Sequence, residues 1–256
     1  MRISIVTPAL NQGEFIEQTI LSVMQQNHGD VEHLVMDGGS TDNTLAILRK
    51  YAHLKWTSER DAGQADAINR GFSLTSGDVL AWLNSDDFYE KNVFGDVAQY
   101  FKSHPDCMVL YGDITYVDRT GKSIVSQTGG TLSYNSLTRF PDLLRQPSFF
   151  WRRAALESAG GLNKRLRLVM DLDFFLRLGR LFPFHYLAKN FSYYRTYPET
   201  KTNSQLGRQA IEIYRVFRRQ GIPVDYQRAR FLLVKVLDSI GIAPVLRSVF
   251  GRKRDV

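Results

Sequence analysis

The stretch Val79-Leu80-Ala81-Trp82-Leu83-Asn84-Ser85-Asp86-Asp87 decides the fold of this chain. Its first five residues form a short apolar run without a helical period, which is typical of a strand buried on both faces. The run ends in two adjacent carboxylates, at the end of a strand where open α/β sheets bind ligands. Adjacent carboxylates repel each other unless a cation lies near them, so the pattern favours a divalent metal that holds a phosphate-bearing substrate. A solvated turn stays open as the alternative, because Asn, Ser and Asp are good turn formers.

A second acidic strand end supports the ligand interpretation. The apolar run 33–36 leads into Asp37-Gly38-Gly39-Ser40-Thr41-Asp42, and a helical pattern follows from Thr44. The two glycines permit close approach of a ligand to the backbone, and a side chain at 40–42 can cap the helix. This layout is typical of a nucleotide site, although the chain lacks the glycine motif of dinucleotide-binding folds and the P-loop motif.

The first hundred residues alternate predicted strands and helices. Strands are expected at 3–8, 33–36, 54–57 and from 79, with helical patterns at 15–24, from 44 and at 65–72. Such alternation predicts an α/β fold with a mainly parallel central sheet and helices on both faces. From residue 108 the pattern changes to strand, hairpin turn (117–122) and strand, followed by strands at 147–151 and 185–194 and helices at 154–159 and 171–181. We therefore expect a nucleotide half at 1–107 and a second-substrate half at 108–206.

The length and composition exclude several classes of protein. With 256 residues and 43% hydrophobic content, the chain can bury a sizeable core, which excludes a disordered or fibrous protein. The lone Cys107 excludes an intrachain disulfide and fits a reducing compartment. The first residues run directly into a predicted strand and leave no room for a signal peptide, so we expect a cytoplasmic protein.

The positive charge is concentrated at the C-terminus. Residues 207–256 hold 11 Lys and Arg against four Asp and Glu, which accounts for the whole net charge of +7. A neutral catalytic region argues against a nucleic-acid partner, and the tail is predicted to be basic, amphipathic and helical. Its apolar stretches are too short to cross a bilayer. Two interpretations stay open, namely peripheral contact with the inner face of the cytoplasmic membrane and packing on the catalytic domain.

Five segments, taken in order, resemble those of family 2 glycosyltransferases with the GT-A fold. They are residues 6–11, 37–44, 61–71, 83–87 and 170–178. Within the family, the chain is most similar to non-processive bacterial enzymes that extend O-antigen and exopolysaccharide repeat units. The resemblance implies a GT-A fold over residues 1–206 with a helical extension, a nucleotide-sugar donor, and Mg²⁺ or Mn²⁺ as cofactor. It also implies a glycan or polyprenyl-diphosphate-linked acceptor.

The resemblance implies roles for residues of the nucleotide half. Thr7, Pro8 and Asn11 are expected near the base or ribose, and Asp37 is expected to accept a hydrogen bond from uracil. Asp66 and Asn69 lie three residues apart on one helical face and are expected to point into the donor pocket, with a helix cap and a solvated amide as the alternatives.

In the family, the segment that matches residues 84–87 binds a metal that bridges the donor diphosphate. Asp86 is therefore the expected metal ligand, with Asn84, Ser85 and Asp87 in contact with the donor. This chain has Asn84 where the family pattern has an acid, which leaves direct coordination at that position in doubt. A metal can complete its shell with water and phosphate oxygens.

Asp171 matches the catalytic carboxylate of the family. An inverting transferase needs such a base to take the proton of the acceptor hydroxyl. Asp173 lies about 200° further around the helix, so both cannot face one substrate, and we give Asp173 a structural role. Arg195 and Lys201 are expected to neutralise charge on the leaving diphosphate, with ordinary surface cations as the alternative. Tyr197 stands where many members have His.

We therefore expect an inverting, metal-dependent glycosyltransferase of surface polysaccharide biosynthesis that uses a UDP-sugar. A nucleotidyltransferase is one alternative, but it would need a glycine-rich, basic loop near the N-terminus, and residues 11–14 do not form one. A non-catalytic sugar- or nucleotide-binding module is another, and the presence of Asp86, Asp87 and Asp171 argues against it.

Overall fold

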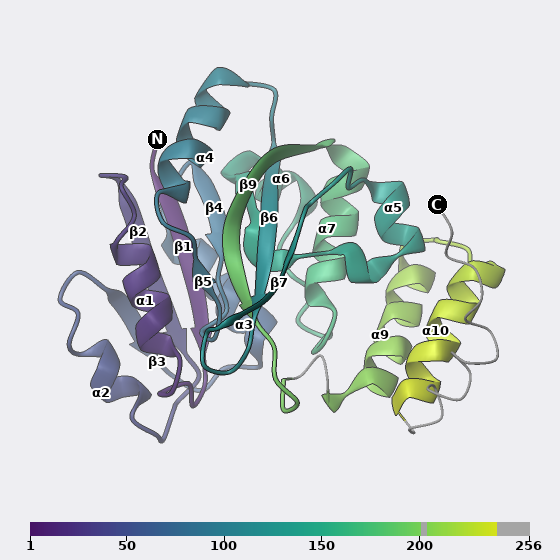
Figure 1. The fold of residues 1–256 in the computed structure, drawn as a ribbon, viewed down its shortest axis with the longest axis horizontal. Helices are drawn as coiled ribbons and strands as arrows, with labels where there is room; N and C mark the ends of the chain where they lie inside the picture. The colour runs from purple at the N-terminus through teal and green to yellow at the C-terminus, as the bar shows by residue number, and fades with distance from the viewer. Residues whose placement is uncertain (201–203, 240–256) are drawn as a thin grey trace.

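The computed structural model describes residues 1–200 and 204–239. Lys201 and the tail residues 240–256, on which predictions were made above, lie outside the described residues. The described strands form one sheet with helices on both faces (Figure 1). The strands are β1 (Ile3–Ala9), β2 (Val31–Asp37), β3 (Lys55–Ser58), β4 (Val79–Trp82), β5 (Phe88–Tyr89), β6 (Val109–Val117), β7 (Ser123–Gln127), β8 (Phe149–Arg152) and β9 (Phe184–Arg195). The helices are α1 (Ile16–Met24), α2 (Thr44–Leu48), α3 (Gln64–Leu74), α4 (Val93–Ser103), α5 (Tyr134–Arg139), α6 (Arg153–Ala159), α7 (Met170–Leu181), α9 (Leu206–Arg219) and α10 (Tyr226–Ser239), with short 3-10 helices η1 (Pro141–Leu143) and η2 (Gln146–Ser148).

The sheet order is β3-β2-β1-β4-β8-β6-β9-β5, and β7 pairs with β6. The first four strands in this order are parallel, as the alternation of strands and helices predicts. The rest of the sheet is mixed, because β8 runs antiparallel to both β4 and β6 while β9 runs parallel to β6. The expectation of a mainly parallel sheet therefore holds for the nucleotide half only, and the predicted hairpin at 117–122 joins β6 to β7.

Side chains of the parallel strands alternate between the two faces of the sheet. Val35 packs in a cluster with residues of α1 and α2, whereas its neighbours Leu34 and Met36 belong to the cluster that includes α3. Gly71 allows α3 to lie close to the sheet, since a Cβ at this position would stand 2.4 Å from Val6 Cγ1. The helices thus cover both faces, as expected for a doubly covered sheet.

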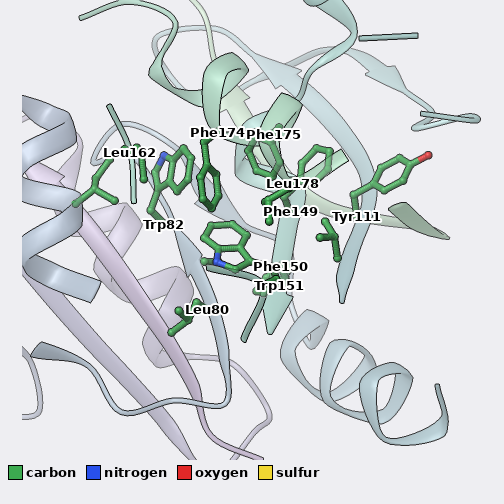
Figure 2. Packing of buried hydrophobic residues seen from close by; sticks show 14 of the residues in the cluster. Leu80, Trp82, Tyr111, Phe149, Phe150, Trp151, Leu162, Phe174, Phe175 and Leu178 are labelled. Atoms are coloured by element: carbon green, nitrogen blue, oxygen red, sulfur yellow. The ribbon is translucent and has the colours of Figure 1, made fainter. Parts of the chain in front are cut away.

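An aromatic core joins the two halves of the molecule (Figure 2). The ring centroids of Trp82 in β4 and Trp151 in β8 lie 5.4 Å apart. The Trp82 ring also lies 5.9 Å from Phe174 and 5.8 Å from Phe175, both in α7. These rings are almost completely buried. As a result, α7, which carries Asp171 in its first turn, is held against the strand that leads to residues 84–87.

Pro8 lies where β1 and β4 part. The last bond between them runs from the Leu83 N–H to the Val6 carbonyl, at 3.0 Å. Along a strand, the backbone groups of alternate residues point to the same neighbouring strand, so the backbone nitrogen of Pro8 points to β4, as that of Val6 does. Proline has no N–H, so the hydrogen-bond ladder between β1 and β4 cannot continue there. β1 and β2 stay paired as far as Ala9 and Asp37. The sheet therefore opens between β1 and β4, at the point where the strand order reverses and open α/β sheets bind ligands.

The two tail helices pack on the domain, next to α5 and α7 (Figure 1). Ile213, Val216 and Phe217 of α9 are at most 1% exposed and belong to the same apolar cluster as Trp82. The Gln220 amide donates to the carbonyl and to Oδ1 of Asp173 in α7, at 3.0 Å each. The described part of the tail therefore shares an apolar core with the rest of the chain, as the packing interpretation expects.

A matched pair on α9 tests this packing. We expect Ile213→Ala to lower the free energy of unfolding by about 2–5 kcal/mol, because it removes buried methylenes and leaves a cavity. Ile211→Ala makes the same chemical change on the exposed face of α9, and we expect it to stay within about 0.5 kcal/mol of the wild type. Urea unfolding measures both. Equal effects of the two substitutions would contradict the packing of α9.

Candidate active site

The loops that follow β1 and β2 are joined by hydrogen bonds. The backbone N–H groups of three successive residues, 11–13, donate to side-chain oxygens of the second loop. The acceptors are, in the same order, Ser40 Oγ, Thr44 Oγ1 and Asp42 Oδ2, at 2.7, 2.9 and 2.9 Å. Asn11 Oδ1 accepts the Thr41 N–H in return, at 2.8 Å. Asn11 has a φ of 52°, in the left-handed region that Asn tolerates better than most residues. The two loops therefore form one connected rim beside the opening between β1 and β4.

Asp37 and Thr7, both predicted nucleotide contacts, are buried beneath this rim. The Asp37 carboxylate accepts the N–H groups of Gly39 (3.0 Å) and Ser40 (2.9 Å), the hydroxyl of Ser58 (2.6 Å) and the hydroxyl of Ser40. Thr7 Oγ1 lies 2.9 Å from His33 Nε2, and burial lowers the pKa of His33 to about 3, so this imidazole is neutral. Asp37 thus supports the second loop from inside the protein, and Thr7 contacts the neighbouring strand β2.

Asp66 and Asn69 of α3 contact the segment that leads into α7. The Asn69 amide donates to the Leu162 carbonyl and accepts the Leu162 N–H, at 2.8 Å each. Asp66 forms an ion pair with Lys164 at 2.5 Å, and this contact lowers the pKa of Asp66. Both side chains therefore lie on one side of α3, as their spacing predicts, and both contact residues 162–164 of the second half. Asp66 also accepts the Ala62 N–H at 3.2 Å, at the start of α3, as the helix-cap alternative expects, whereas the solvated amide does not describe Asn69.

Residues 84–87 form a turn held by its own side chains and by its neighbours. The Asn84 amide donates to Asp87 Oδ2 (3.2 Å) and accepts from Gln64 of α3 (2.9 Å). Thr19 of α1 donates to the carbonyls of Ser85 (3.0 Å) and Asp87 (2.7 Å). Asn84, Ser85 and Asp87 thus fix the shape of the turn.

The two carboxylates of this turn differ in environment. Asp87 is 1% exposed and accepts the Arg195 N–H at 2.9 Å, while burial and the neighbouring charge of Asp86 raise its pKa well above the usual value. Asp86 is half-buried. Burial, followed by the charge of Asp86, raises the pKa of the Tyr197 hydroxyl to about 12, so Asp86 and Tyr197 lie near each other. Asp86 is therefore the more exposed carboxylate of the turn.

Arg195 lies underneath this turn. Its Nε donates to the Asp86 carbonyl at 2.9 Å, Nη1 donates to the carbonyls of Asp118 (3.2 Å) and Arg119 (2.7 Å), and Nη2 donates to Gln18. The guanidinium also lies over the Phe15 ring, 4.8 Å from its centroid, and is almost completely buried. This arrangement differs from the expected contact with a diphosphate, because every nitrogen of the guanidinium already has an acceptor in the protein.

An exposed cation that the sequence did not indicate lies nearby. Arg119, at the tip of the β6–β7 hairpin, stacks over the Tyr197 ring with its Cζ 5.2 Å from the centroid. It forms an ion pair with Glu14 at 2.7 Å. The sequence of residues 117–122 predicts only a turn, and no local pattern indicates that the fold brings this turn beside Tyr197.

Asp171 and Asp173 have different environments in the first turn of α7. Asp171 is half-buried, its Oδ1 accepts the Leu172 N–H at 2.8 Å, and burial raises its pKa to about 6. Asp173 is 1% exposed and pairs with Arg177 at 3.1 Å. A carboxyl group whose pKa approaches neutrality is suited to general base catalysis, whereas a buried, paired carboxylate is suited to a structural role.

The chemistry of the 84–87 turn fits a cation that arrives with its ligand. Within residues 1–200 and 204–239, no group of three or more His, Cys, Asp or Glu side chains could hold a metal ion. Asp86 offers one carboxylate, and that of Asp87 is engaged with the turn. Mg²⁺ is commonly bound by one or two carboxylates together with water and substrate phosphates. These residues therefore fit a phosphate-dependent cation site and do not form a complete cage of protein ligands.

Comparison with known proteins agrees with this geometry. The sequence model described as Glycosyl transferase family 2 matches residues 4–159. The chain is 32% identical over 180 residues to a PGL/p-HBAD biosynthesis glycosyltransferase of Mycobacterium bovis, and the match covers 68% of each chain. It is 27% identical to the chondroitin synthase of Escherichia coli over 73% of this chain and 28% of that protein.

Solved structures share the fold. The crystal structure of S. aureus TarS 1-349 in complex with UDP-GlcNAc superposes with a TM-score of 0.71 at 19% identity, over 100% of this chain and 77% of that one. The mannosyltransferase PcManGT from Pyrobaculum calidifontis, in complex with GDP-Man and Mn²⁺, gives a TM-score of 0.64 at 14% identity, over 100% of this chain and 76% of that one. The expected GT-A fold is confirmed.

Proposed function

Because this chain belongs to glycosyl transferase family 2, we propose that it moves a sugar from a nucleotide-sugar, a UDP-sugar in the first instance, to a hydroxyl group of a glycan or lipid-linked oligosaccharide. The observation that carries this proposal is that one aromatic core holds both the 84–87 turn and the first turn of α7. The UDP-GlcNAc bound to TarS supports a UDP-sugar, and the biosynthetic names of the relatives support a role in surface glycan synthesis. Family membership argues against a nucleotidyltransferase and against a module without activity.

On this proposal, Asp86 holds Mg²⁺ or Mn²⁺ together with water and the donor phosphates. The cation supplies charge neutralisation for the leaving nucleoside diphosphate. Asn84, Ser85 and Asp87 keep the turn in shape, and Arg195 fixes the Asp86 carbonyl from below. Thr7, Pro8, Asn11 and Asp37 form the wall and rim that receive the nucleoside, through backbone groups and loop shape more than through their side chains.

Asp171 serves as the base. It takes the proton of the acceptor hydroxyl while that oxygen bonds to the anomeric carbon and the bond between this carbon and the diphosphate oxygen breaks. A single displacement of this kind inverts the configuration and releases the nucleoside diphosphate. Only the ionised carboxylate can accept the proton, so activity falls as the pH is lowered through the raised pKa of Asp171, which is about 6.

We also propose that the exposed face of the tail contacts an anionic membrane that carries the acceptor. Arg208, Ile211, Arg215 and Arg218 recur at helical spacing on the exposed side of α9, and Arg230 and Leu233 do so on α10. Each Lys or Arg close to an anionic leaflet contributes about 1 kcal/mol of attraction. None of the helices in the described part of the chain has the length and apolar content needed to cross a bilayer. Packing of the buried face and membrane contact of the exposed face are compatible.

Asp86→Ala tests the metal assignment. We expect the variant to lose transfer and to lose the increase in UDP affinity that Mn²⁺ gives the wild type, because the diphosphate no longer shares a cation with the protein. Calorimetric titration of UDP with and without Mn²⁺ measures this. Asp106→Ala, which removes an exposed carboxylate elsewhere, is the control and should behave as wild type. An unchanged Mn²⁺ effect in Asp86→Ala would rule out Asp86 as the ligand.

Asp171→Asn tests the base. The amide keeps the shape of the side chain but cannot accept the proton, so we expect turnover to fall roughly 10²-fold or more while UDP affinity stays the same. The wild type should show an acid limb in its pH–rate profile near pH 6, where Asp171 titrates. Steady-state kinetics between about pH 5 and 8 measures both the turnover and the acid limb. Wild-type turnover in the variant would show that another residue is the base.

Sedimentation with anionic liposomes tests the membrane contact. We expect the full-length wild type to pellet at low salt and the double variant Arg215→Glu/Arg218→Glu to stay in the supernatant. The control, Lys91→Glu/Lys102→Glu, makes the same charge change at exposed positions at and near α4 and should pellet as the wild type does. If the wild type does not pellet, or if both double variants behave alike, the exposed face of the tail is not a membrane surface.

A further inference from the structure

Glu212 of the tail helix α9 contacts the backbone immediately before α7. Its carboxylate accepts the N–H groups of Arg167 (3.1 Å), Leu168 (2.9 Å) and Val169 (3.3 Å). Val169 is the N-cap residue of α7, and its own side chain makes no capping hydrogen bond. A carboxylate from a distant helix therefore holds the backbone that leads into α7.

The contact with Glu212 completes a set that fixes the start of α7 from two sides. On the side of α3, Asn69 holds Leu162, and Arg167 donates to the Ala62 carbonyl. The Arg167 guanidinium lies so close to Gly63 that a Cβ there would stand 1.6 Å from Nη1. On the side of the tail, Glu212 binds the same segment. The direction of Glu212 is set in turn by Ile213, the next residue, which is 1% exposed in the core.

We propose that Glu212 is a positioning residue for Asp171, and that the tail helix α9 is for this reason part of the catalytic apparatus. The inference rests on the proposed function of Asp171 as base. Asp171 is the second residue of α7, two positions after Val169. A shift in the backbone at 167–169 is therefore passed directly to the carboxylate that must meet the acceptor hydroxyl. Displacements of about 1 Å at a reacting group can cost as much as 10²-fold in rate.

Electrostatics adds a second effect of the same residue. Besides burial, the charge of Glu212 raises the pKa of Asp171. Five other charged groups near this turn have partners of their own. Asp66 pairs with Lys164, Asp173 pairs with Arg177, and the Arg167 guanidinium donates to the Ala62 carbonyl. Removal of the Glu212 charge therefore lowers the pKa of Asp171 and moves the acid limb of activity to lower pH.

The test compares Glu212→Gln, Glu212→Asp and the wild type as full-length enzymes. We expect Glu212→Gln to lower kcat about 10-fold or more, to leave KM for the donor and UDP affinity unchanged, and to move the acid limb to lower pH. Glu212→Asp keeps the charge with a shorter reach, so its acid limb should stay in place while kcat falls. The control, Glu157→Gln, makes the same chemical change at an exposed position of α6 and should match the wild type.

Two results would overturn the inference. One is a Glu212→Gln enzyme with the kcat and the pH profile of the wild type. The other is a parallel loss of kcat and UDP affinity, which a general loss of structure would produce. If Glu212→Gln does not fold, Glu212→Asp decides, since a kcat equal to that of the wild type contradicts the positioning role. Failure of the proposed function can be told apart from failure of this inference. Full activity of Asp171→Asn would show that Asp171 is not the base, whatever the Glu212 variants do.

Discussion

One buried cation, the guanidinium of Arg195, organises the centre of this molecule. It stands at the end of β9 and donates to the Asp86 carbonyl, to the tip of the β6–β7 hairpin and to Gln18 of α1. Burial of a charge is costly unless each donor finds an acceptor, so the strand end, the hairpin and the helix must all stay in place around it. The Arg195 N–H also binds the Asp87 carboxylate. Asp87 is thus held from below, and Asp86 is the more exposed acid of the pair.

The fold was largely predictable because its signals are local. Buried apolar runs and helical periods predict β1, β2, β4 and α7 within a few residues of their bounds. The pairing of the second half was not predictable in the same way. The sequence indicates β9 as a strand, but its parallel pairing with β6 depends on contacts between residues far apart in the chain. A hairpin turn predicts only that the two strands it joins pair with each other, as β6 and β7 do.

The sequence predicts where the candidate site lies better than it predicts what each of its side chains contacts. A polar residue at a strand end can hold a ligand or the loop itself, and both uses favour the same residue types. Asn69 and Arg195 show the second use, because their polar groups bind backbone or side-chain atoms of the protein. Arg119 and Glu212 lay outside any motif. Glu212 is separated by 45 residues from Arg167, and only the packing of α9 brings the two together.

The contact of Glu212 with the segment before α7 also bears on the order in which the protein folds during translation. Chains fold from the N-terminus as they leave the ribosome. Strands β1 to β4 and helix α3 precede residue 83, so the crevice between β1 and β4 can form early in synthesis. The start of α7 acquires its full set of contacts only after Glu212 has emerged. A nascent chain can therefore form its first four strands well before the helix that bears Asp171 is fully held, and the final helices of the described chain complete the contacts of α7.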